Sequence, residues 1–192
     1  MVTKLASLGA FFSGVGALSA LIISLSQIKK NSKFNEANFW LTLREMFNTS
    51  NRVNIHEDLR KGKWIAEVPK NHQYWIKLED YLGIFEICER MLARRIINKK
   101  MFISLYEYRI YNFLANKEIA KRKLILEYSD WFYFYKLLKR IYGKSWIEFY
   151  EFLKRNDHII KESESETTFI QAMSKSNKEK YNKFKESLNL AE

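Results

Sequence analysis

The chain has 192 residues and a net charge of +11, with 47% hydrophobic and 16% aromatic residues. This length suits one domain plus an anchor, and the apolar content excludes a globally disordered chain. One proline and six glycines are too few for the turns of an all-β sandwich, so an all-α protein is expected.

The first predicted element is a single N-terminal transmembrane helix at about Leu5 to Ile28. Its 24 positions carry no charge, and about 20 such residues span a hydrocarbon core. A cleaved signal peptide is the alternative, but the apolar run continues past the only plausible cleavage site, Ser19-Ala20. The positive-inside rule then places the following domain in the cytoplasm and the protein in the inner membrane, with three lysines at the lipid surface: Lys29, Lys30 and Lys33.

Small residues recur at close to four-residue spacing in this segment: Gly9, Ser13, Gly14, Gly16 and Ala20. Such stripes let membrane helices approach closely, which favours self-association. Small residues are also common in membrane helices in general, so both interpretations stay open.

Residues 1–33 are thus predicted to form the anchor and a basic juxtamembrane segment, and residues 34–155 a cytoplasmic helical bundle. The bundle's only cysteine, Cys88, is expected to be a small buried hydrophobe, because unpaired cysteine is among the most buried residue types. Asn51 is a predicted N-cap, Gly62 a predicted helix end, Asn98 a predicted left-handed helix end, and Gly143 a predicted break between the last two helices of the bundle. Apolar spacing places the helices at Asn35 to Phe47, Asn51 to Gly62, Asn71 to Ile97, Lys100 to Ala115, Lys117 to Leu126, Trp131 to Ile141 and Trp146 to Lys154, with a loop at Trp64 to Pro69.

Residues 156–192 are predicted to hold a loose connection followed by a C-terminal amphipathic helix. Residues 156–176 are rich in Lys, Glu, Ser and Thr, which is typical of a connection. From Asn177 to Leu190, three apolar residues share one face and could dock on the bundle: Tyr181, Phe184 and Leu188.

Arg109 lies on the apolar stripe of its predicted helix, and a buried unpaired charge costs several kcal/mol. A carboxylate of the preceding helix is therefore expected to pair with it, with Glu86 favoured. An internal ion pair that fixes helix register is preferred over a functional pocket. The full predicted polar core or pocket comprises Glu79, Glu86, Arg109, Asn112 and Asn116, and Glu89 is a further pairing candidate.

Basic residues are concentrated in residues 90–155, which carry 16 basic and 6 acidic groups. The aromatic run Trp131 to Tyr135 lies among them, and basic grooves beside stacking rings bind single-stranded nucleic acid. Membrane lipid headgroups are a stronger candidate partner, and an ordinary solvated face is the bland alternative. The predicted basic patch comprises Arg94, Arg95, Lys99, Lys100, Lys121, Arg122, Lys123, Lys139 and Arg140.

No motif supports an enzyme. The three histidines fit no zinc spacing, and His56 beside Glu57 and Asp58 is a weak catalytic candidate. Phosphate-binding glycine loops and nucleophile elbows do not occur. We therefore expect no metal and no cofactor.

Several strings resemble an uncharacterised bacterial family, a domain of unknown function: FWLTLREMF (Phe39 to Phe47), Val53 to His56, YWIKLEDYLGIFEICERML (Tyr74 to Leu92) and YEYRIYNFLAN (Tyr106 to Asn116). The resemblance implies a membrane anchor and a small helical domain, with no established activity. The favoured hypothesis is a membrane-anchored cytoplasmic interaction module with a protein partner or a homo-oligomeric state, serving as effector or sensor of a bacterial stress or phage-defence system. Architecture alone suggests the defence role. The alternative is a membrane-tethered domain that binds or cuts nucleic acid.

Overall fold

A computed structural model describes residues 27, 31, 34–188 and 190 of the chain. It divides into two compact units, residues 1–43 and residues 44–192, and each is described by itself. The predicted membrane helix, its small residues and the three juxtamembrane lysines lie outside the described residues. Among the residues that are described, no helix combines the length and apolar character needed to cross a membrane.

The described part of the first unit is the helical stretch 34–43. Within it, Trp40 Nε1 donates a hydrogen bond to Glu36 Oε1 over 3.4 Å, one helical turn earlier. Phe39 meets the Trp40 ring edge to face, with ring centroids 6.3 Å apart. Helical backbone over residues 34–47 agrees with the helix predicted at Asn35 to Phe47.

The second unit consists of helices joined by short turns, and the described residues contain no strand, which confirms the all-α class. After residue 47 the elements are α2 (Ser50–Arg60), α3 (His72–Ala93), α4 (Lys99–Ala115), α5 (Lys117–Lys121), the π-helical turn η1 (Arg122–Leu126), the 3₁₀ turn η2 (Tyr128–Trp131), α6 (Phe132–Tyr142), α7 (Ser145–Arg155), α8 (Asp157–Lys161), α9 (Glu166–Ala172) and α10 (Lys175–Ser187).

Two predicted helix ends are confirmed and two are wrong. Gly62 follows α2 with φ +68° and Gly143 follows α6 with φ +112°, conformations that suit glycine. Asn51 lies inside α2, whose N-cap is Thr49. Asn98 does not end α3: the Lys100 N–H donates to its Oδ1 over 2.8 Å, so Asn98 caps the start of α4.

Helix α3 ends five residues earlier than Asn98, at Ala93. Arg95 takes the left-handed conformation there, with φ +57°. The early turn lets Ile97 enter the core at 4% exposure while Ile96 stays 37% exposed. Local sequence predicts that this helix ends at Asn98. Burial of Ile97 in the core explains why it ends earlier.

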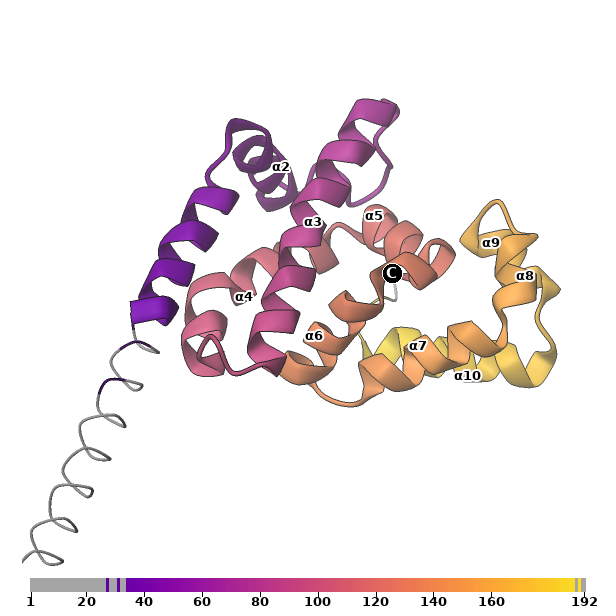
Figure 1. Cartoon of the computed structure of the whole chain (residues 1–192). Helices are drawn as coiled ribbons and strands as arrows, with labels where there is room; N and C mark the ends of the chain where they lie inside the picture. Colours follow the sequence, from indigo (N-terminus) through magenta and orange to yellow (C-terminus); the bar gives the residue numbers. More distant parts are fainter. Residues whose placement is uncertain (1–26, 28–30, 32–33, 189, 191–192) are drawn as a thin grey trace, which may run out of the picture. The chain divides into compact units, whose positions relative to one another are not determined.

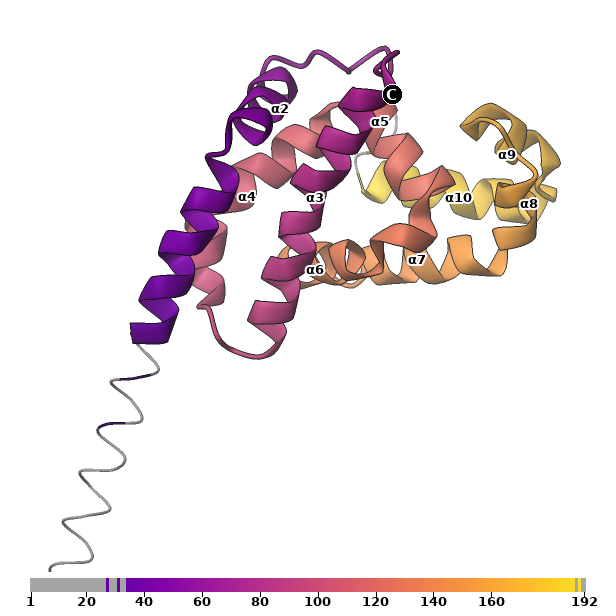
Figure 2. The ribbon, with the colours of Figure 1, turned by 45° about the horizontal axis from the view of Figure 1, so that its top comes forward.

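The core of the second unit forms where α3 packs against α2 and α6, and their arrangement can be followed in Figures 1 and 2. Phe134 of α6 joins this core to α4, because its ring lies 5.9 Å from Phe85 of α3 and 5.6 Å from Phe113 of α4. Cys88 is buried on the same stripe as Phe85, which confirms its predicted role as a small hydrophobe. Burial raises the pKa of its thiol far above the usual value.

The predicted loose connection at residues 156–176 contains two short helices, α8 and α9. Ser165 forms a capping box with Thr168 at the start of α9, and Phe169 is buried inside it. The prediction missed these helices because the composition of the segment is polar. One buried ring and one cap are enough to stabilise a short helix. Helix α10 then docks as predicted, with Tyr181 packed on Phe149 and Phe152 of α7.

Candidate functional site

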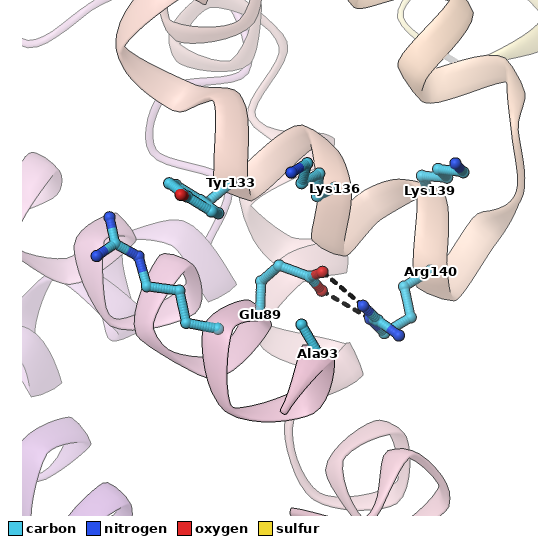
Figure 3. A pocket seen from close by; sticks show the side chains of 7 residues that line it. Glu89, Ala93, Tyr133, Lys136, Lys139 and Arg140 are labelled. Carbon is cyan, nitrogen blue, oxygen red and sulfur yellow. Dashed lines mark hydrogen bonds and ion pairs between the residues drawn. The ribbon is translucent and has the colours of Figure 1, made fainter. Parts of the chain in front are cut away.

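The strongest candidate interaction surface is a basic groove between α3 and α6, shown in Figure 3. It encloses about 400 Å³. We call it the α3–α6 groove, and its lining residues are Glu89, Arg90, Ala93, Tyr133, Lys136, Lys139 and Arg140. Four cationic groups against one carboxylate give this lining a formal charge of +3.

One ion pair organises the floor of the α3–α6 groove. The Arg140 guanidinium of α6 donates two hydrogen bonds to the carboxylate of Glu89 on α3, over 2.7 and 2.6 Å. Glu89 is only 2% exposed, so the forked contact neutralises a buried charge and fixes α6 on α3. The hydrogen bond to Glu89 raises the pKa of Arg140 above its ordinary value.

The other cations of the groove lie over aromatic rings. The Arg90 guanidinium is 4.3 Å from the centroid of the Tyr133 ring, and Lys136 Nζ is 4.3 Å from the Phe132 centroid. Each contact stabilises a cation that keeps its full charge. Lys139 is exposed beside them, so the groove presents positive charge that the protein itself does not neutralise.

Four residues of the predicted basic patch follow the last groove residue of α3 in the sequence. Arg94 and Arg95 follow Ala93 directly, and Lys99 and Lys100 open α4; all four side chains are exposed. Together with Lys139, they keep the exposed basic character that the sequence predicts, whereas Arg140 is half-buried in its ion pair with Glu89.

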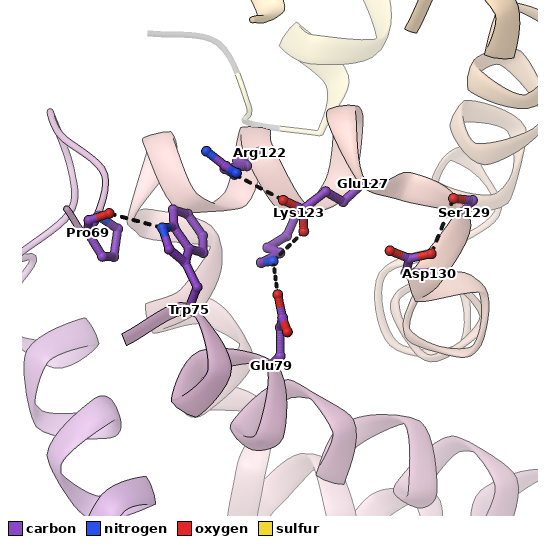
Figure 4. Close-up of polar contacts among 8 residues, drawn as sticks. All are labelled: Pro69, Trp75, Glu79, Arg122, Lys123, Glu127, Ser129 and Asp130. Atoms are coloured by element: carbon purple, nitrogen blue, oxygen red, sulfur yellow. Dashed lines mark hydrogen bonds and ion pairs between the residues drawn. The ribbon is translucent and has the colours of Figure 1, made fainter. Parts of the chain in front are cut away.

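The predicted members Lys121 and Lys123 do not belong to an exposed patch. Lys123 is 1% exposed and donates to Glu79 over 2.5 Å and also to Glu127. This network, seen in Figure 4, extends to Arg122, which donates to Glu127 over 3.0 Å. Lys121 is buried and lies 3.1 Å from Glu118. The prediction is wrong for these lysines because helical packing buries both of them beside carboxylates, including Glu79 for Lys123 and Glu166 for Lys121, which are distant in sequence.

The predicted ion pair between Arg109 and Glu86 does not form in the described part of the chain. Arg109 instead lies among rings, with its Nε donating to Tyr108 Oη over 3.0 Å. Helix α3 packs against α2 and α6, and three of its acidic side chains pair with cations of α2, η1 and α6. Of the alternative partners, Glu79 binds Lys123 and Glu89 binds Arg140.

Glu86 has a role at the start of α6. Its carboxylate lies near the backbone N–H groups of Tyr133 and Phe134, in the first turn of that helix. A negative charge is favourable at this end of a helix, where the first N–H groups have no partner within the helix. Burial raises the pKa of Glu86, and the two backbone donors oppose that shift.

Asn116 is fully buried and joins two segments of backbone. Its amide donates to the carbonyl of Leu59 and to that of Asn112, each over 2.7 Å, and its Oδ1 accepts from the Trp64 N–H over 2.8 Å. These bonds hold the loop after α2 against the end of α4. The predicted polar pocket is therefore wrong as a unit: Glu79, Glu86, Arg109 and Asn116 occupy four separate environments.

Sequence reasoning missed the surroundings of His56. The ring is 8% exposed, its Nδ1 lies 3.5 Å from Tyr81 Oη, and the Tyr108 ring meets it edge to face. Burial, with the charge of Arg109, lowers the pKa of His56 to about 4. The histidine is thus a neutral core group at physiological pH, and only the tertiary packing reveals it.

No candidate metal centre occurs among the described residues, where no three metal-binding side chains converge. Comparisons with family models, curated proteins and solved structures found no match for this chain.

Proposed function

We propose that the chain is a membrane-anchored interaction module, whose helical domain contacts anionic lipid headgroups through the α3–α6 groove. The observation that carries the proposal is the excess of cations in the groove: Arg90, Lys136 and Lys139 form no ion pair with a carboxylate of the described residues, whereas Glu89 is paired with Arg140. An uncharged leader of 24 residues supports the membrane location. A role as effector or sensor of a bacterial defence system stays a prediction.

We prefer lipid over nucleic acid as the partner because the aromatic rings of the groove already contact its cations. Binding of single strands needs aromatic faces on which bases stack. The Tyr133 ring already carries the Arg90 guanidinium, and Phe132 carries Lys136 Nζ, so these faces are engaged within the protein. Headgroup phosphates need only accessible cations, each worth about 1 kcal/mol near an anionic surface.

The test measures vesicle binding of residues 34–192, with circular dichroism and thermal melting to confirm folding. We expect sedimentation with vesicles containing anionic phosphatidylglycerol and none with neutral phosphatidylcholine. Lys136→Glu with Lys139→Glu should weaken binding more than about tenfold, because four units of charge change beside the lipid.

The matched control is Lys175→Glu with Lys183→Glu, which changes the net charge equally on exposed positions of α10. Its binding should stay close to that of the unmodified protein. An equal loss of vesicle binding in both double variants would show that net charge alone explains the effect. It would contradict specific binding through the groove. Binding to RNA or DNA alone, with a steep salt dependence, would favour the nucleic-acid alternative.

A further inference from the structure

A second site lies around Arg109, away from the α3–α6 groove. Arg109 is 9% exposed, and its Nη1 is buried without a hydrogen-bond partner among the described residues. Its guanidinium carbon is 4.8 Å from the Phe47 ring centroid and 5.5 Å from that of Tyr108. Aromatic rings stabilise the cation but accept no strong hydrogen bond. The Nη1 side of the guanidinium can therefore still donate one.

Three carboxylates of α2 and α3 are paired with other cations. Glu57 binds Arg60 over 2.7 Å, Asp58 binds Lys63 over 2.9 Å, and Asp80 binds Arg52 over 2.7 Å. Burial raises the pKa of Tyr142 to about 12, and the charge of Glu107 of α4 adds to this effect. A buried guanidinium without a counter-charge is costly, which marks Arg109 as a group that an external anion would stabilise.

The space beside Arg109 is a cavity of about 250 Å³, here called the Arg109 cavity. Its buried part is formed by Phe47, Tyr106 and Arg109, while Arg44, Asn48 and Tyr108 are exposed around it and open it to solvent. Among the described residues, the lining holds two guanidinium groups and no carboxylate. Amide and phenol groups add neutral donors close to the two charges.

We propose that the Arg109 cavity binds a phosphate group, carried by inorganic phosphate or by a small phosphate monoester. Two guanidinium groups match the charge of a phosphate dianion, and arginine is suited to planar, bidentate contacts with its oxygens. The volume is below the range of about 300–1,000 Å³ typical of drug-sized ligands, so the ligand is small. The buried Phe47 ring covers one side of Arg109, where the lower dielectric strengthens contacts of its charge.

The test is calorimetric titration of the full-length protein in detergent micelles with inorganic phosphate and with phenyl phosphate, at constant ionic strength. We expect one binding site per chain. Arg109→Met should weaken phosphate binding roughly ten- to hundredfold, as expected for loss of a charge-assisted hydrogen bond. Lys136→Glu with Lys139→Glu should leave this binding unchanged, which separates the cavity from the proposed groove function.

Arg44→Met provides a second variant whose folding is secure, because Arg44 is exposed. It should weaken phosphate binding several-fold without lowering the melting temperature. Absence of binding to the unmodified protein, or unchanged affinity in Arg44→Met and Arg109→Met, would overturn the site. Benzoate binding as tightly as phenyl phosphate would overturn the assignment to phosphate.

Discussion

The buried Lys123 network offers the sharpest test of the packing. Lys123 is 1% exposed, while its partners Glu79 and Glu127 are 46% and 28% exposed at their side chains. Either carboxylate alone can balance the lysine charge. We therefore expect Glu79→Gln and Glu127→Gln each to lower the free energy of unfolding by about 1 kcal/mol, as for partly exposed ion pairs.

The double variant leaves Lys123 buried with no carboxylate partner in this network. Breaking a buried ion pair in this way costs about 3–5 kcal/mol, so the loss should exceed the sum of the single losses by at least about 1 kcal/mol. Lys123→Met removes the buried charge itself, and both carboxylates can then turn to water. Its cost should stay within about 1 kcal/mol.

Urea unfolding of the full-length protein in micelles, followed by tryptophan fluorescence, measures all four variants. Lys123 Nζ lies 4.8 Å from the Trp75 ring and 6.0 Å from the Trp131 ring, so the emission also reports local changes. A Lys123→Met variant as unstable as the double glutamine variant would refute the reasoning. So would strictly additive effects of the two glutamine substitutions.

Three further predictions concern titratable core groups. Burial raises the pKa of Glu86, so its stabilising contribution is present at acid pH and is lost as pH rises through that raised value; Glu86→Gln should flatten this fall in urea midpoints. The pKa of His56 is lowered to about 4, so stability present above pH 6.5 should be lost as pH falls through 4, and a pH series of melting temperatures should show a smaller acid loss in His56→Gln. Arg140→Ala should cost about 3–5 kcal/mol in chemical unfolding, because it leaves Glu89 buried and unpaired, whereas Arg140→Lys should cost less; equal costs would contradict the forked geometry.

Local sequence alone determined the helices and the apolar stripes. Helical spacing of apolar residues predicted the stripe with Phe85 and Cys88, and glycine at positions 62 and 143 predicted two helix ends. These features depend on neighbours within a few residues, where backbone preferences and periodicity act directly. The Ser165 cap and the buried Phe169 ring were overlooked only because the surrounding composition is polar.

Only the tertiary structure decided which charges meet. Pairing of Glu89 with Arg140 and of Glu79 with Lys123 joins residues 51 and 44 positions apart, and depends on how α3 is rotated against α6 and η1. The same packing leaves Arg109 among rings instead of beside Glu86. Helical periodicity fixes the side of a helix on which a charge lies, but the neighbour on that side is set by packing of the whole core.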